Sequence, residues 1–310
     1  TPAFFTTRPS QEDYKFYGVF DGHCGTRAAK FASRALHLNL EVFLNAQEAT
    51  KPSSPPQPPS PDDDAPPENI ASIERAVRRA FRKTQEDFLG LRARETETRV
   101  PAAAEGVAAA AAAAVSEDDS GTTATVALVY PDVTVVAHVG DSRAVLMPIR
   151  HTLVPPRPPS SSLRADCWTD HTPYSTSERA RVEANGGSVE HRGVLRVNGE
   201  LAVTRTLGNR RLSRDGVLSS EPDVVFVGGG KNTTFLVLAS DGLWDVVSSQ
   251  EAVDMVKEVI LGSSPGVPRG YGSYVPGQTF QVAATALTHE AYVRGSTDNI
   301  GVCVVDLRHH

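Results

Sequence analysis

Three aspartates in this 310-residue chain stand beside segments that are otherwise apolar. Asp21 follows FYGVF and is succeeded by Gly22 and His23. Asp241 follows FLVLAS, and Asp298 comes just before IGVCVV. An ionised carboxylate at the edge of an apolar core is costly unless an opposite charge compensates it. If the chain folds so that these acids converge, they predict a cation site.

The residue types favour a hard cation. Carboxylate and carbonyl oxygens are ligands of Mg²⁺ and Mn²⁺, whereas zinc would need Cys or His clustered with the acids. Gly22 has no side chain to keep its carbonyl from an ion. Two ions sharing a carboxylate would hold a hydroxide at neutral pH and clamp a phosphoryl oxygen. A single Asp-Gly pair most often forms a turn, and that interpretation stays open for each pair.

The elements that would position these acids follow from apolar spacing. Segments rich in Val and aromatic residues and bounded by Gly, Pro or Asp predict strands at 14–20, 122–130, 133–139, 143–147, 223–227, 233–240 and 300–307. Apolar residues at three- and four-residue spacing predict helices at 26–44, 70–91, 175–186, 248–262 and 278–294.

Two details refine this pattern. Ser175-x-x-Glu178 and Ser248-x-x-Glu251 are both capping boxes by sequence, so each should open its helix. The three strands within 122–147 are joined by tight turns, which predicts an antiparallel meander. Strands grouped together with helices around them indicate an α+β layered fold.

Composition limits the classes of protein. The net charge of −6 and the lack of a Lys/Arg-rich run argue against nucleic-acid binding, and no apolar segment is long enough for a membrane span. The three scattered cysteines indicate a reducing compartment, and we expect a cytoplasmic or nuclear location. His138 and His171 are expected to be core or turn residues. Low-complexity insertions are predicted at about 51–68, 101–119, 148–162 and 262–277.

Eight motifs occur here in the order found in the metal-dependent Ser/Thr protein phosphatase family, protein phosphatase 2C. They are FYGVFDGHCG, GTTATVALV, AHVGDSRAVL, TDHTPYSTSERARVEANGGSV, GELAVTRTLGN, EPDV, LASDGLWDVVSSQEAV and STDNIGVCVV. The chain therefore resembles this family from Tyr14 to Leu307. The resemblance implies one catalytic domain over 1–310, a four-layer α-β-β-α sandwich of two mainly antiparallel β-sheets flanked by helices.

The resemblance also implies a two-metal site that uses Mg²⁺ or Mn²⁺. Asp21 matches the metal-bridging aspartate and Gly22 the residue whose carbonyl binds one ion. Asp241 and Asp298 match the further metal-binding aspartates.

Three more residues gain roles from the resemblance. His23 matches the general acid that protonates the leaving Ser/Thr oxygen, a role that suits an imidazole with an ordinary pKa of ~6.5. Asp141 and Asp245 match acids of a weaker third metal site.

The implied activity is hydrolysis of phosphoserine and phosphothreonine in phosphoproteins, by attack of a metal-bound water. A monomer is expected. A non-catalytic relative, with the same fold used as a binding or regulatory module, is the alternative.

Two departures from the family pattern bear on activity. The family's phosphate-binding Arg and following Glu-Asp should precede Asp21 by more than one strand. Arg8, Glu12 and Asp13 repeat that order but leave no room for the strand. We therefore expect that the chain starts just after this motif, with TPAFFTT as the tail of the strand, and that its activity is in doubt without the motif.

The second departure lies in TRTLGN. Asn209 stands where the family usually has Asp, which could alter loop packing or peptide preference. Thr204 and Thr206 replace commoner small residues in the same motif and are expected to be harmless.

Overall fold

The computed structural model describes residues 3–7, 14–48, 68–98, 119–131, 133–148, 169–228, 233–261 and 279–307. The four predicted insertions fall outside these ranges, apart from single residues at their ends. Arg8, Glu12 and Asp13 also lie outside them. Within the described part of the chain, no helix is both long and apolar enough to cross a membrane.

Two main antiparallel sheets form the centre of the fold. The first has the strand order β1 (Ala3–Thr7), β2 (Lys15–Phe20), β5 (Ala124–Val129), β6 (Val133–Val139) and β11 (Asp223–Gly228). The second has the order β13 (Val302–Asp306), β12 (Thr233–Ala239) and β7 (Arg143–Pro148). The strand predicted from TPAFFTT is thus present as β1, paired with β2.

Two small sheets lie beside the main ones. One has the order β10 (Leu207–Gly208), β4 (Gly121–Thr122) and β3 (Gly22–His23), and the other pairs β8 (Val189–Arg192) with β9 (Val194–Val197).

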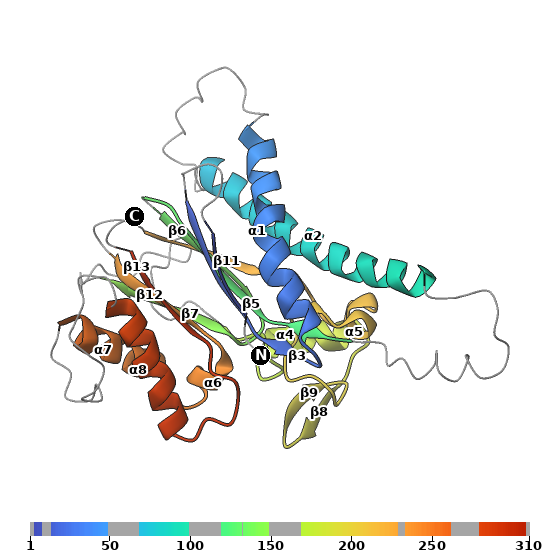
Figure 1. The fold of residues 1–310 in the computed structure, drawn as a ribbon. Coiled ribbons are helices and arrows are strands. Elements are labelled where there is room, and N and C mark those ends of the chain that lie inside the picture. Colours follow the sequence, from blue (N-terminus) through green and yellow to red (C-terminus); the bar gives the residue numbers. More distant parts are fainter. Residues whose placement is uncertain are drawn as a thin grey trace, which may run out of the picture.

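Helices cover both outer faces of the paired sheets (Figure 1). They are α1 (Arg27–Glu48) and α2 (Glu68–Thr98) on the first sheet, and α7 (Ser249–Leu261) and α8 (Thr279–Val293) on the second. Three shorter helices are α4 (Thr176–Ala184), α5 (Arg210–Arg214) and α6 (Asp241–Trp244). The α-β-β-α order of layers is the one predicted, and the α+β class is confirmed.

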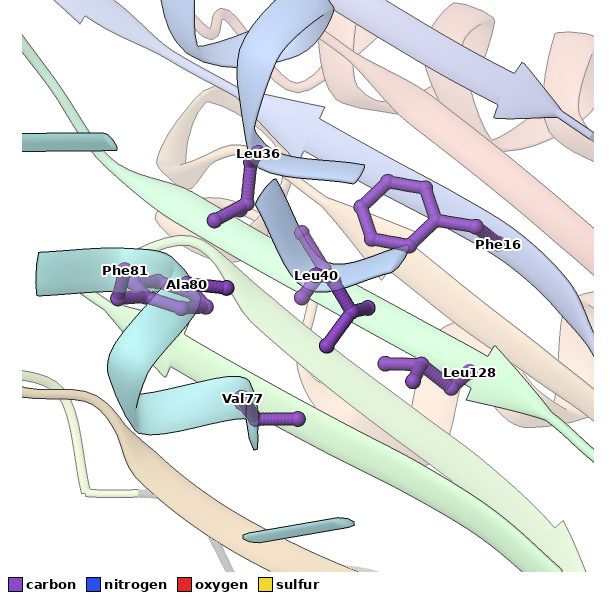
Figure 2. A pocket seen from close by; sticks show the side chains of 8 residues that line it. Phe16, Leu36, Leu40, Val77, Ala80, Phe81 and Leu128 are labelled. Atoms are coloured by element: carbon purple, nitrogen blue, oxygen red, sulfur yellow. The ribbon is translucent and has the colours of Figure 1, made fainter. Parts of the chain in front are cut away.

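Alternating side chains build the layers. On β5, Val126 and Leu128 pack against α1 and α2, whereas Ala127 and Val129 face the second sheet. Figure 2 shows the apolar side chains that meet between the two helices and the first sheet. They are Phe16, Leu36, Leu40, Val77, Ala80, Phe81, Val126 and Leu128, all at most 2% exposed. This space is packed core and offers no binding site.

The predicted meander is wrong in its third strand. β5 and β6 form the expected hairpin, but β7 pairs with β12 in the second sheet, and β11 occupies the edge of β6. The contacts of β7 give the reason. Ala144 and Leu146 pack between the two sheets, whereas Val145 packs under α7 and α8, the helices that cover the second sheet.

One of the two predicted capping boxes forms. The backbone N–H of Ser248 donates to Glu251 Oε2 (2.9 Å), and Glu251 N–H donates back to Ser248 Oγ (3.3 Å). At Ser175 the side chain makes no capping hydrogen bond. Glu178 turns inward instead, because Arg205 and Thr204 donate to its carboxylate.

Candidate metal centre

Asp21 lies where β2 leaves the first sheet. Its backbone N–H donates to Thr123 Oγ1 (3.1 Å), and Thr123 N–H donates to the Asp21 carbonyl (2.8 Å). Gly22 follows in β3, where an added Cβ would lie 3.1 Å from the Ala29 Cβ and 3.2 Å from the Gly25 carbonyl oxygen. The backbone at Gly22 is therefore closely packed, and Thr123 holds both the N–H and the carbonyl of Asp21.

Asp241 begins α6 at the end of β12, and hydrogen bonds tie this strand end to the loop that carries Asp298. Ser240 Oγ donates to the Asn299 carbonyl (3.0 Å) and accepts from Gly301 N–H (3.0 Å). These bonds hold the two aspartates on neighbouring backbone segments.

Gly242 makes this approach possible. A Cβ at this position would lie 2.5 Å from the Asn299 carbonyl oxygen, so any side chain would push the loop away. The Gly242 carbonyl in turn accepts from Ser296 Oγ (2.7 Å). The glycine of this Asp-Gly pair therefore serves close packing between strand end and loop, and the turn interpretation alone does not account for it.

The aspartates repel one another strongly. Burial, and then the charges of Asp141 and Asp21, raise the pKa of Asp241 to about 8. Burial, and then the charges of Asp170 and Asp21, raise the pKa of Asp141 to about 7. Burial also raises the pKa of Asp21, although its carboxylate shares a hydrogen bond with Asp241. Like charges held this way need a cation to ionise together.

We use the name aspartate cluster for five acids whose charges act on one another in the structure, which are Asp21, Asp141, Asp241, Asp245 and Asp298. Asp298 is exposed, whereas Oδ1 of Asp241 is buried and has no hydrogen-bond partner among the described residues. A buried carboxylate oxygen without a donor is what a site for a hard cation requires, so these residues fit Mg²⁺ or Mn²⁺.

Two residues of this region were missed by sequence reasoning. Asp170 accepts from Arg143 Nε (2.7 Å) and Nη2 (2.5 Å), which holds both side chains beside Asp141. Thr123 fixes Asp21 and also exchanges a hydrogen bond with Ser142 (2.8 Å). Both lie inside conspicuous motifs, TDH and GTT, but only the tertiary fold reveals their partners.

The side chain of His23 contacts Asn209. Its Nε2 lies 2.7 Å from Asn209 Oδ1, and burial lowers the pKa of its imidazole. The structure thus joins the predicted general acid to the residue at which the sequence departs from the family pattern.

A second grouping of potential ligands consists of His138, His171 and Asp223, whose ligand atoms lie within 4.8 Å of one another. The two imidazoles stack with centroids 4.4 Å apart and planes 4° from parallel, so one ion cannot lie in the plane of both rings. His171 Nδ1 accepts from Gly140 N–H (3.2 Å), and its Nε2 lies 3.2 Å from Asp223 Oδ2. Both rings are buried, in agreement with the prediction of core residues.

Comparison with known proteins finds the family that the sequence motifs indicate. A sequence model of the family described as protein phosphatase 2C matches residues 3–300. The chain is 34% identical over 303 residues to probable protein phosphatase 2C 6 of Oryza sativa subsp. japonica, covering 95% of this chain and 56% of that protein. It is 32% identical over 289 residues to probable protein phosphatase 2C 59 of Arabidopsis thaliana, covering 93% and 68%. The chain thus spans little more than half of the rice relative.

Solved structures show the same fold. The crystal structure of serine-threonine phosphatase 2C from Toxoplasma gondii has a TM-score of 0.66 at 20% identity, covering 99% of this chain and 94% of that one. A C. elegans sex determining protein has a TM-score of 0.68 at 21% identity, covering 99% and 61%.

Proposed function

This chain belongs to the protein phosphatase 2C family, whose members are metal-dependent phosphatases, and we propose that it hydrolyses phosphoserine and phosphothreonine in proteins with Mg²⁺ or Mn²⁺ as cofactor. The observation that carries the proposal is the aspartate cluster. Its buried acids have raised pKa values, and Asp241 Oδ1 has no hydrogen-bond donor among the described residues. That arrangement is unfavourable unless divalent cations bind.

We assign the cation ligands to Asp21, the Gly22 carbonyl, Asp241 and Asp298, with Asp141 and Asp245 beside a weaker third site. When bound, two such cations would lower the pKa of a coordinated water and offset the charge of the phosphoryl oxygens. The likeness to the family would assign Asp21 to both cation sites, and its carboxylate shares a hydrogen bond with Asp241 and feels the charge of Asp298.

Residues of this chain would position the cation ligands and supply the proton for the leaving group. Thr123 holds the Asp21 backbone, and the Ser240–Asn299 hydrogen bond holds Asp241 near the loop of Asp298. His23 would give a proton to the Ser or Thr oxygen as it leaves. A positioned acid of this kind contributes typically about 10²–10⁴-fold to rate.

The test is hydrolysis of a phosphothreonine peptide in Mn²⁺ and in EDTA, by the wild type, Asp241→Asn and the control Asp254→Asn. Asp254 lies on α7, where it accepts from Gln250 and Lys257 at the surface. We expect turnover that needs Mn²⁺, a loss of at least about 100-fold in Asp241→Asn, and wild-type turnover in Asp254→Asn. Mn²⁺ should also raise the melting temperature of the wild type but not that of Asp241→Asn.

Turnover that persists in EDTA, or an unchanged rate in Asp241→Asn, would count against the proposal. Binding of the phosphopeptide without turnover, in a protein that Mn²⁺ still stabilises, would favour the non-catalytic alternative.

A further inference from the structure

We infer that Asn209 is a positioning residue for His23, holding the imidazole across Gly121 in the tautomer that carries its hydrogen on Nε2. The inference deepens the proposed function and rests on it for the part that His23 takes in the reaction. The tautomer itself is a property of the folded chain, and it can be measured without any turnover.

The small sheet of β3, β4 and β10 brings the two side chains together. His23 on β3 is paired with Gly121 on β4, and Gly121 is paired on its other side with Gly208, which precedes Asn209. Gly121 thus lies between the residues that meet. A Cβ on Gly121 would overlap both Asn209 Oδ1 and His23 Nε2, so the two side chains share the space that this glycine leaves open.

The orientation of the Asn209 amide is set by its other contacts. Its Nδ2 donates to the Asp119 carbonyl (2.8 Å), and a carbonyl can only accept. The atom that faces His23 is therefore Oδ1, at 2.7 Å from Nε2, and it can only accept as well. His23 must then donate from Nε2, so in the neutral imidazole Nδ1 is the ring nitrogen without a hydrogen.

Both the backbone and the side chain of Asn209 are fixed by their contacts. It is 1% exposed, its backbone N–H donates to the Ser120 carbonyl (3.0 Å), and Thr206 Oγ1 lies 3.2 Å from its Oδ1. Its φ of 48° lies in the left-handed region, which Asn tolerates better than most residues. A partner fixed in backbone and side chain fixes the imidazole in turn.

The same contacts explain why this chain has Asn where its family usually has Asp. Both side chains offer an acceptor to His23. Only Asn also offers a donor to the Asp119 carbonyl, against which a carboxylate oxygen would be repelled. The departure therefore keeps the acceptor toward His23 and adds an anchor.

The decisive variant is Asn209→Gly, which keeps the left-handed backbone and removes the amide. Asn198→Gly is its matched control, because Asn198 has a φ of 49° and its Oδ1 accepts from Ser188 N–H (2.7 Å) at the β8–β9 unit. Asn209→Asp restores an acceptor for His23. Each is measured in two ways, by ¹⁵N NMR of the His23 imidazole and by hydrolysis of two substrates.

The NMR spectrum of the wild type should show hydrogen on Nε2, and Asn209→Gly should show a mixture of tautomers. Turnover of a phosphothreonine peptide, whose leaving oxygen needs a proton, should fall by about 10²-fold in Asn209→Gly. Turnover of p-nitrophenyl phosphate, whose leaving group needs none, should stay near wild type. Asn209→Asp should recover part of the lost peptide turnover, and Asn198→Gly should resemble the wild type in both measurements.

Hydrogen on Nδ1 in the wild type would overturn the inference, whether or not Asn209→Gly folds. An equal loss on both substrates would also overturn it, since that result indicates a structural role alone. If the wild type hydrolyses neither substrate, the proposed function fails while the NMR result still decides the His23–Asn209 contact.

Discussion

Two groups of carboxylates in this fold have opposite surroundings. In the aspartate cluster, burial and mutual repulsion raise the pKa values of Asp141 and Asp241 to about 7 and about 8. In a second group, which we call the arginine-paired network (Glu178, Arg181, Arg205 and Asp223), the pKa of Glu178 is lowered to about 2. The two groups lie in one chain, so the difference comes from what each carboxylate contacts.

The arginine-paired network supplies both of its acids with donors. Arg205 Nε and Nη2 donate to Glu178 Oε1 (3.0 and 2.6 Å), Thr204 Oγ1 donates to Oε2 (2.7 Å), and Arg205 Nη1 donates to Asp223 (2.8 Å). Burial alone would raise the pKa of Glu178, but these hydrogen bonds and the Arg205 charge outweigh it. His171 and Arg205 likewise hold the pKa of Asp223 well below its usual range.

The comparison distinguishes carboxylates that stabilise the fold from carboxylates that bind a ligand. A carboxylate that stabilises the fold is buried together with its cation, as Glu178 is with Arg205. A carboxylate that binds an exchangeable cation is buried without one, and the fold carries the repulsion until the ion arrives. The aspartate cluster has the surroundings of the second kind, which is what the proposed function requires.

The largest effect on stability is expected from Arg205→Met, which removes the arginine that donates twice to Glu178 and once to Asp223 and leaves Glu178 paired with Arg181. Breaking a buried pair costs about 3–5 kcal/mol, and the Arg181 pair that remains should hold the loss toward the lower end of that range. The free energy of unfolding is measured with urea in EDTA. The control is Arg192→Met, because Arg192 pairs with Glu190 on the surface, where its loss should cost less than about 1 kcal/mol. Equal costs in the two variants would mean that Glu178 is not stabilised by its partner.

Much of the fold, and the positions of its acids, could be predicted from the sequence. Helix and strand ranges follow from local spacing, and the acids at strand ends are visible as breaks in apolar segments. The path of β7 into the second sheet could not be predicted, because a short buried strand carries no mark of its neighbour. Glu178 was assigned to a capping box for a similar reason, since its true partners Thr204 and Arg205 are distant in sequence.

A pH titration should separate the two groups by the sign of their effect. Asp241 has a folded pKa of about 8 and an ordinary value of 3.8, so its contribution to stability is full below 3.8 and is lost as pH rises to about 8. Glu178, at about 2 against 4.5, contributes fully above 4.5 and loses its contribution as pH falls toward 2. Each group changes the free energy of unfolding by at most about 1.4 kcal/mol per pH unit.

The metal-free protein should therefore be most stable in mild acid and weaken toward pH 8, as measured by urea unfolding in EDTA. Asp241→Asn should flatten the decline toward pH 8 but leave the loss in strong acid unchanged. Mn²⁺ should stabilise the wild type most at the alkaline end. A metal-free protein that gains stability from pH 5 to 8 would contradict the assignment of an uncompensated cluster.

The smallest effect on stability is expected at Asp170, which pairs with an arginine and also repels a member of the aspartate cluster. Arg143 is paired with Asp170 through two hydrogen bonds, yet Asp170 also repels Asp141. Asp170→Asn weakens the pair but relieves that repulsion and leaves Arg143 beside Asp141 and Asp245. The two changes offset one another, so the free energy of unfolding in EDTA should change by less than about 1 kcal/mol. Arg143→Met should cost more, because it leaves Asp170 charged next to Asp141 without a cation. If Asp170→Asn costs as much as Arg143→Met, Asp170 is a structural acid of the same kind as Glu178, and Arg143 does not moderate the aspartate cluster.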